Sequence, residues 1–174
     1  MNKYRTSILA LCVSAACLVG IAGFEGYRSD AYRDVAGVPT IGYGETAGVK
    51  IGQKTTPDRA LIQLLSSANK HADAVRQCVN VPLYQHEFDA YVSLAYNIGP
   101  SAFCKSTLVK ELNKGNYESA CSHIKDFNGI TVSVPKKIIK NGEIVTVVKK
   151  EKKVIPGLTK RRQTEYLMCM GSAV

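Results

Sequence analysis

The sequence predicts an α+β protein with a small β region, a larger and mainly helical lobe, an inserted β-hairpin and an N-terminal apolar helix. Three observations support this prediction. Residues 24–52 are rich in Gly and Tyr and contain short alternating stretches, which favours short strands. Apolar residues recur at helical spacing through much of 57–121 and again near the C-terminus. Two β-branched runs flank Asn141-Gly142, which is a strong hairpin signal.

The size and composition indicate one globular domain. The chain has 174 residues, of which 45% are apolar, so it is long enough to bury a proper core. The net charge of +9 favours polyanionic partners such as nucleic acid, anionic lipid or the acidic polymers of a bacterial envelope. The same charge is also consistent with a solvated basic surface, so charge alone does not choose a function.

The N-terminal segment is the first element along the chain. Lys3 and Arg5 precede an uncharged run from Ser7 to Phe24, 18 residues long, whereas about 20 apolar residues typically span a bilayer. The leading positive charges would keep the N-terminus in the cytoplasm. Because the run is rich in Ala, Gly, Ser and Cys, we expect it to insert weakly and later leave the membrane. We therefore divide the chain into an anchor segment, 1–24, and a main domain, 25–174.

A cleaved signal peptide is the competing interpretation of this segment. Gly20 and Ala22 form a small-x-small pattern before Gly23, as at a cleavage site. Cleavage there would leave Glu25, a candidate functional residue considered below, third from the new terminus. Little upstream structure would then remain to position its side chain. We therefore favour a retained segment.

The helices of the main lobe follow in order. Thr56 is a candidate N-cap with Pro57 at the first helical position, and the helix runs to about residue 79. A buried helix over 85–98 ends at Gly99-Pro100. Two short helices are expected over 106–112 and 116–121, and a last helix carries LTKRRQTEYLMCMG.

The predicted hairpin, residues 130–155, interrupts this helical body and is rich in lysine. These lysines either grip an anionic envelope polymer or provide solubilising charge that also prevents edge-to-edge aggregation. They are Lys136, Lys137, Lys140, Lys149, Lys150, Lys152 and Lys153.

The cysteines and histidines do not form a metal-binding pattern. None of the cysteines forms a CxxC pair and the histidines are scattered, so we expect neither a metal nor a cofactor. The glycine-rich IGYGETAG lacks the Lys-Ser/Thr of a phosphate loop. The four cysteines in the body of the chain are consistent with two structural disulfides in an oxidising compartment, or with four reduced thiols. The residues concerned are Cys12, Cys17, Cys78, Cys104, Cys121, Cys169, His71, His86 and His123.

Glu25, Asp34 and Thr40 are the candidate catalytic residues. They place two carboxylates and a hydroxyl within FEGYRSDAYRDVAGVPTIGYGET. Hydrolysis of a glycosidic bond typically needs one protonated carboxyl as general acid and a second, ionised one facing it. Their spacing alone is equally consistent with a capping Glu and a turn Asp.

Three segments together resemble the phage-type lysozymes, the endolysin family of glycoside hydrolases from tailed phages. They are the segment just quoted, FDAYVSLAYNIGPSAFCKSTLVKELNKGNY and IPGLTKRRQTEYLMC, and the resemblance covers residues 24–129 and 154–170. It implies a lysozyme-like fold with a cleft between the β region and the helical lobe. The insertion at 130–153 departs from the family pattern. The N-terminal segment resembles the signal-arrest-release anchors of a subset of these endolysins.

The resemblance also implies roles for individual residues. Glu25 matches the family's general acid, while Asp34 and Thr40 match the pair that activates a water molecule. Such an arrangement predicts inversion at the anomeric carbon if the carboxyls lie about 6.5–9.5 Å apart. A general acid must hold its proton near neutral pH, so we expect an apolar setting for Glu25, to which Phe24 and Tyr43 are available, as is Ile41.

The remaining expectations concern structure and location. The expected disulfides are Cys78–Cys104 and Cys121–Cys169, with the state of Cys12 and Cys17 left open. Tyr43 and Asn97, with Arg161 or Arg162, are candidates for lining or supporting the cleft, although each is equally consistent with packing or capping.

The expected substrate is peptidoglycan, and nucleic acid is not expected as a partner. The protein would be a monomer held at the inner membrane through residues 7–24 and released into the periplasm. Alternatives are a secreted lysozyme with a cleaved signal peptide, a lytic transglycosylase, or a non-catalytic wall-binding protein that uses the lysine hairpin.

Overall fold

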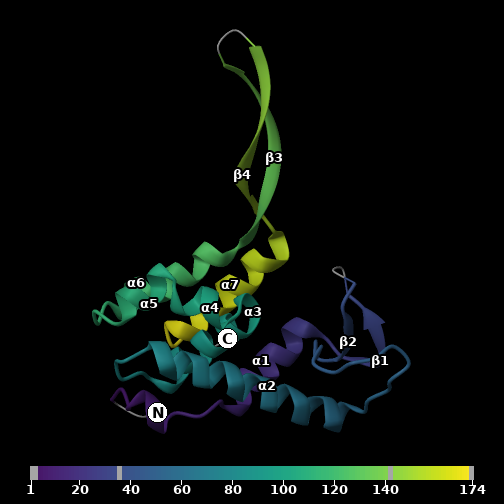
Figure 1. Ribbon diagram of the computed structural model, residues 1–174. Helices are drawn as coiled ribbons and strands as arrows, with labels where there is room; N and C mark the ends of the chain where they lie inside the picture. The colour runs from purple at the N-terminus through teal and green to yellow at the C-terminus, as the bar shows by residue number, and fades with distance from the viewer. Residues whose placement is uncertain (1–3, 35–36, 141–142, 173–174) are drawn as a thin grey trace.

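The computed structural model describes residues 4–34, 37–140 and 143–172, with side chains described outside 137–145. A helical body carries a small β region at one end, and a long hairpin projects from it (Figure 1). In chain order the elements are η1 (Ile8–Ala10), α1 (Ala15–Glu25), β1 (Arg28–Arg33), β2 (Pro39–Gly42), α2 (Pro57–Cys78), α3 (Gln85–Ile98), α4 (Pro100–Cys104), α5 (Thr107–Leu112), α6 (Tyr117–His123), η2 (Ile124–Phe127), β3 (Gly129–Lys140), β4 (Glu143–Val154) and α7 (Pro156–Cys169). This is the predicted α+β architecture.

Helix α3 forms the centre of the core. Every residue from Glu87 to Ala95 is buried, so the helix is enclosed on all sides. Helices α7, α2 and α1 each pack against it. Its C-cap is Gly99, whose φ of 86° favours glycine and ends the helix where the sequence predicts.

Helix α2 buries one stripe of small and apolar residues at intervals of three or four. Thr56 is the N-cap residue and Pro57 occupies the first helical turn, as predicted. The buried stripe consists of Ala60, Leu64, Ala68, Ala72 and Val75.

Helix α4 is an element that the sequence analysis did not predict. Pro100 begins it, because proline is favoured at the first helical position. Proline also often follows the end of a helix, so Pro100 is consistent with both the end of α3 and the start of α4. With five residues, α4 is too short to show a helical period in the sequence. The two helices that follow, α5 and α6, correspond to the predicted pair.

The β region is a two-stranded antiparallel sheet. Tyr32 pairs with Thr40 and Arg33 with Pro39. Strand β1 ends immediately before Asp34, and Thr40 lies within β2. Both candidate residues therefore belong to the same short sheet and its connecting loop.

Strands β3 and β4 form the inserted hairpin as a second, separate sheet. Their register runs without a break from Gly129 paired with Val154 to Lys140 paired with Glu143. The turn residues Asn141 and Gly142 lie outside the described residues. The observed strands match the predicted hairpin, 130–155, within a residue at either end.

The N-terminal segment is folded against the body. It contains η1, an extended stretch and then α1, which begins at the N-cap Ser14. The predicted apolar helix is thus 11 residues long and does not fill the 18-residue uncharged run. Among the described residues, no helix has the length and apolar character needed to cross a bilayer. Cys17 and Ile21 of α1 are buried in the core.

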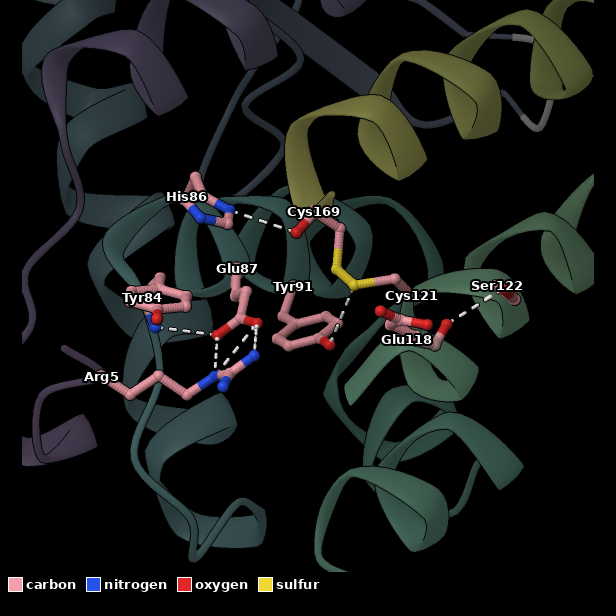
Figure 2. The surroundings of a disulfide bond; sticks show 9 residues. All are labelled: Arg5, Tyr84, His86, Glu87, Tyr91, Glu118, Cys121, Ser122 and Cys169. Carbon is pink, nitrogen blue, oxygen red and sulfur yellow. Dashed lines mark hydrogen bonds and ion pairs between the residues drawn. A yellow bond between two sulfur atoms is a disulfide. The ribbon is translucent and has the colours of Figure 1, made fainter. Parts of the chain in front are cut away.

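Two disulfides tie the helices together, and they join the pairs expected from the sequence. Cys78–Cys104 links the ends of α2 and α4, and Cys121–Cys169 links α6 to the end of α7 (Figure 2). Closing loops with sequence separations of 26 and 48 residues contributes about 3–4 kcal/mol each in the chain-entropy model. Cys12 and Cys17 are free thiols, and burial raises the pKa of Cys17.

Candidate active site

Glu25 is the last residue of α1 and lies where the chain leaves the helical body for the β region. Gly26 follows it with a φ of 72°, a conformation that glycine adopts without steric cost. The glycine turns the chain directly into β1. The position of the Glu25 side chain is therefore set by the packing of α1.

A buried guanidinium contacts Glu25 from the helical lobe. Arg161 Nη1 donates to Glu25 Oε1 at 2.8 Å, and the Arg161 side chain is only 8% exposed. The guanidinium also lies over the Phe24 ring, 4.6 Å from its centroid. Glu25 itself keeps 24% of its side chain exposed, so solvent or a ligand can reach it.

The same guanidinium belongs to a buried network on α7 and α3. Arg161 Nε donates to Glu165 Oε1 at 3.1 Å, and Ser93 Oγ donates to the same oxygen at 2.8 Å. Arg162 Nε lies 2.7 Å from Glu165 Oε2. Burial lowers the pKa of Arg162, with Glu165 opposing this effect. The charge of Arg161 is thus shared between Glu25 and Glu165, which is fully buried.

The β region approaches Glu25 from the other side. Gly44 follows β2 with a φ of 86°, and a Cβ at this position would lie 3.3 Å from Glu25 Oε2. The positive φ favours glycine, and a Cβ here would press on the Glu25 carboxylate unless that side chain shifted by a few tenths of an ångström. Glu25 is therefore enclosed between Gly44 of the β region and Arg161 of the helical lobe.

Asp34, just after β1, and Thr40, within β2, both hydrogen-bond to Val38. Val38 N donates to Asp34 Oδ1 at 2.8 Å, while Thr40 Oγ1 donates to the Val38 carbonyl at 3.0 Å. Gly37 N also donates to the Asp34 carbonyl at 2.9 Å. These bonds hold both side chains at fixed positions relative to β2. Thr40 is buried, with 4% of its surface exposed.

Tyr43 packs within an aromatic group beside Glu25. Its ring lies 5.5 Å from that of Tyr27, and its carbonyl accepts a hydrogen bond from Tyr96 at 3.4 Å. Burial raises the pKa of Tyr96 to about 12, and the charges of Glu25 and Glu45 add to the shift. Tyr96 therefore stays protonated and remains a hydrogen-bond donor at neutral pH.

Asn97 lies at the end of α3 and is exposed. It lines a cavity of about 520 Å³ together with Phe127 and the base of the hairpin. Asn97 and Tyr43 therefore belong to different surroundings, the first to this cavity and the second to the aromatic group. 

The sequence analysis did not identify Glu165 or Ser93. Glu165 follows Arg161 and Arg162 by four and three residues, a spacing at which helical side chains meet, so the RRQTE segment carried this signal. The ion pair of Glu25 with Arg161 also differs from the apolar setting expected for this carboxyl. It joins residues 136 positions apart, which no local pattern reveals.

The fold and these residues define a lysozyme-like protein with a carboxylate between a small β region and a helical lobe. The family model for phage lysozyme matches residues 22–165. A SAR-endolysin of Pseudomonas phage phiKMV is 35% identical over 156 residues, covering 90% of this chain and 87% of the relative. An endolysin of Acyrthosiphon pisum secondary endosymbiont phage 1 is 35% identical over 153 residues, covering 88% and 94%.

A solved structure agrees with these relatives. The endolysin from Escherichia coli O157:H7 phage FAHEc1 superposes with a TM-score of 0.77 at 34% identity, covering 98% of both chains. The chain belongs to the phage lysozyme family. It is a muramidase-type glycosidase, and the family implies peptidoglycan as its substrate.

Proposed function

We propose that this protein lyses the host cell by hydrolysing the β-1,4 bond between N-acetylmuramic acid and N-acetylglucosamine in peptidoglycan. Glu25 is the general acid, and Asp34 with Thr40 activates the attacking water. The observation that carries this proposal is the enclosure of Glu25 between Gly44 and Arg161, on the boundary between the two lobes. A polymer lying along that boundary would meet the acid from one lobe and the water-activating pair from the other.

The proposed reaction needs a different task from each residue. Glu25 gives its proton to the glycosidic oxygen as the bond to the anomeric carbon breaks. Asp34 accepts a proton from the water that attacks the opposite face, and Thr40 orients that water. Because Val38 hydrogen-bonds both Asp34 and Thr40, the loop supports a fixed position for the water. The product would carry the inverted configuration at the anomeric carbon.

Substitution of the acid tests this assignment. We expect purified Glu25→Gln protein to clear peptidoglycan at least about 10²-fold more slowly than wild type, because an amide is far too weak an acid to protonate the leaving oxygen. Glu118→Gln is the matched control. Glu118 is exposed on α6, so this variant should retain full activity. Clearance by Glu25→Gln at the wild-type rate would contradict the proposal. Anhydro-muramic ends in the products would indicate a lytic transglycosylase instead.

We also propose that residues 7–24 first hold the protein at the periplasmic side of the inner membrane and then dock onto the body. The resemblance to SAR-endolysins supports this interpretation. Loss of membrane potential would release the segment, and the periplasmic monomer would be the active form. Because Glu25 ends α1, the acid would reach its position only when this helix docks.

The body offers polar partners for the docked segment. Ser14 donates through its backbone nitrogen and its hydroxyl to Asp89, at 3.2 and 2.6 Å. Gln85 donates to the Cys12 carbonyl at 2.7 Å, and Arg76 to the Leu11 carbonyl at 2.6 Å. These bonds give hydrogen-bond partners to the Leu11 and Cys12 carbonyls and the Ser14 nitrogen, which precede α1 and make no helical hydrogen bond there.

Arg5 makes the most extensive of these contacts. Its guanidinium lies 2.8 and 3.0 Å from the two carboxylate oxygens of Glu87, which is almost fully buried (Figure 2). It also lies over the rings of Tyr84 and Tyr117, at 4.6 and 3.5 Å. If residues 7–24 crossed the bilayer, Arg5 and Glu87 would lie on opposite sides. The pair is therefore specific to the docked state.

Fractionation of cells before and after depolarisation tests the tether. We expect the full-length protein in the membrane fraction and without activity before depolarisation, and soluble and active afterwards. A soluble, active protein before depolarisation, with an N-terminus at Gly23, would support the cleaved-signal alternative and contradict release of a retained segment.

A further inference from the structure

The side chain of Arg5 lies against two tyrosine rings of the helical body. Its guanidinium carbon is 4.6 Å from the centroid of the Tyr84 ring and 3.5 Å from that of Tyr117. The face of an aromatic ring attracts a cation, and a guanidinium fits such a face well because it is planar. The two rings therefore form two walls of a site that suits a planar cation.

Glu87 completes this site with a buried carboxylate. Arg5 Nη2 donates to Glu87 Oε1 at 2.8 Å and Arg5 Nε donates to Oε2 at 3.0 Å, which is a bidentate contact between a guanidinium and a carboxylate (Figure 2). Tyr84 N donates to the same Oε2 at 2.8 Å and holds the carboxylate in place. The Glu87 side chain is only 4% exposed. We call Tyr84, Glu87 and Tyr117 the cation cage.

The cation cage is built without the N-terminal segment. Tyr84 is the N-cap residue of α3, Glu87 lies in the first turn of that helix, and Tyr117 is the first residue of α6. The disulfide Cys121–Cys169 joins α6 to α7, and α7 packs on α3. The body therefore holds the two rings and the carboxylate together, and we expect the cage to persist when Arg5 is removed.

The cation cage is reachable from solvent and has spare room beside it. The Arg5 side chain is 29% exposed, so its guanidinium does not seal the site. A cavity of about 180 Å³ adjoins the guanidinium. The lining consists of Arg5, the three cage residues, His86, Glu118, Met170 and the disulfide Cys121–Cys169. In the described part of the chain, Glu87 is the only carboxylate that pairs with Arg5. A free cation can therefore reach the cage when Arg5 is elsewhere.

We propose that the cation cage is a binding site for a free alkylguanidinium cation, which it takes whenever Arg5 is not docked. The fork of a guanidinium matches both oxygens of Glu87, and its flat face matches the rings of Tyr84 and Tyr117. An ammonium has neither the fork nor the flat face. Arg5 is thus a ligand of this site that belongs to the same chain.

The tethered protein would present the cage empty, and this part of the inference rests on the proposed function. With Arg5 on the cytoplasmic side of the bilayer, the cage faces the periplasm. Of the described donors to the Glu87 carboxylate, only Tyr84 N then remains. Removing the cation from a buried carboxylate is unfavourable, so the cage attracts another one. Arg5 displaces that cation as the N-terminal segment docks.

Chemical rescue of a cage that lacks its arginine provides the test. Arg5→Ala in the full chain deletes the atoms that make up ethylguanidinium. We expect this cation to bind the variant with a Kd of about 1 mM, as suits a ligand of so few atoms. At about 10 mM, the ratio of folded to unfolded variant should rise about elevenfold, which raises the unfolding midpoint by about 3–6 °C. Wild-type protein, whose cage holds Arg5, should shift by less than about 1 °C. An equal shift in both proteins would overturn the proposal.

Two further ligands separate shape from charge. Ethylurea resembles ethylguanidinium but is neutral, so it should leave the midpoint of Arg5→Ala unchanged. Ethylammonium carries the charge without the planar fork, so it should bind at least about threefold more weakly than ethylguanidinium. A rescue by either compound equal to that by ethylguanidinium would overturn the assignment of a guanidinium site.

Two carboxylates of the same cavity supply matched variants. In the Arg5→Ala background, Glu87→Gln should weaken the binding of ethylguanidinium at least about tenfold, because it removes the charged acceptor of both hydrogen bonds. Glu118→Gln removes the same charge from an exposed position outside the cage, so it should weaken binding less than about twofold. Equal weakening in the two variants would overturn the proposal in favour of general charge attraction.

The titration needs neither membrane nor peptidoglycan, so its outcome is separate from that of the proposed function. If ethylguanidinium does not rescue Arg5→Ala while depolarisation releases wild-type protein, this inference alone fails. If rescue is found but wild-type protein is soluble and active before depolarisation, the tether fails and the binding site stands. If Arg5→Ala does not fold unaided, recovery of its native circular dichroism replaces the midpoint, and no recovery with ethylguanidinium overturns the proposal.

Discussion

Replacing Arg5 by Ala should destabilise the docked N-terminal segment and thereby the whole fold. The substitution removes the guanidinium that contacts both carboxylate oxygens of Glu87 and stacks on Tyr84 and Tyr117. It leaves the Glu87 carboxylate, whose side chain is 4% exposed, without its cationic partner.

The magnitude follows from this burial. Breaking a fully buried ion pair by removing one partner costs about 3–5 kcal/mol. Because 29% of the Arg5 side chain is exposed, solvent recovers part of this, and we expect a loss of about 2–3 kcal/mol in the free energy of unfolding. For a chain of this length, that loss lowers the unfolding midpoint by about 4–12 °C.

Chemical denaturation of purified protein is the assay, with Lys54→Ala as the matched control. Lys54 pairs with Asp30 at 3.0 Å, but both side chains are largely exposed, so its loss should destabilise the protein much less than the loss of Arg5. A double-mutant cycle of Arg5→Ala with Glu87→Gln should give a coupling free energy of about 1–3 kcal/mol. If Arg5→Ala is no more destabilising than Lys54→Ala, or the coupling is zero, the docking contact does not stabilise the fold.

Three further substitutions test other contacts. Gly44→Ala should lose activity and about 1–2 kcal/mol of stability, because its Cβ would press on the proposed acid. Gly48 also has a positive φ but open space around it, so Gly48→Ala should lose stability only. Equal peptidoglycan clearance by the two variants would refute the close approach of Gly44 to Glu25. Arg161→Ala should cost about 2–3 kcal/mol of stability, because it removes one of two guanidinium partners from fully buried Glu165 while Arg162 keeps the carboxylate paired. A loss below about 1 kcal/mol in urea unfolding would contradict this. Burial raises the pKa of Asp89 above its unfolded value, so ionisation of Asp89 opposes folding. The stability of wild-type protein should therefore fall relative to that of Asp89→Asn as pH rises from about 3.5 to 7. A difference in unfolding free energy between the two proteins that stays constant across that range would refute the shift.

The sequence predicts the elements whose signals are local. The stripe of α2, the glycine that ends α3 and the Asn-Gly between two β-branched runs each lie within a short window. Helix α4 escapes prediction because five residues show no period. The N-terminal run appears in the sequence as one apolar stretch, but η1 and an extended stretch precede α1, and that stretch hydrogen-bonds to residues 65 or more positions away.

The surroundings of Glu25 could not be predicted in the same way. Position and neighbouring motifs identify Glu25 itself, and RRQTE indicates that Arg161 and Glu165 share a helix face. The contact of Glu25 with Arg161 depends on how α1 and α7 pack on α3, which is a property of the whole fold. The role of Gly44 likewise depends on the approach of two lobes.

The anomeric configuration of the first product tests the central claim most directly. Proton NMR of peptidoglycan fragments during early hydrolysis, before mutarotation, reports which anomer is released. Glu25 as acid, with water activated by Asp34 and Thr40, predicts the α-anomer first from wild-type protein and no product from Glu25→Gln. The β-anomer as first product, or an anhydro end without a free anomer, would contradict the account.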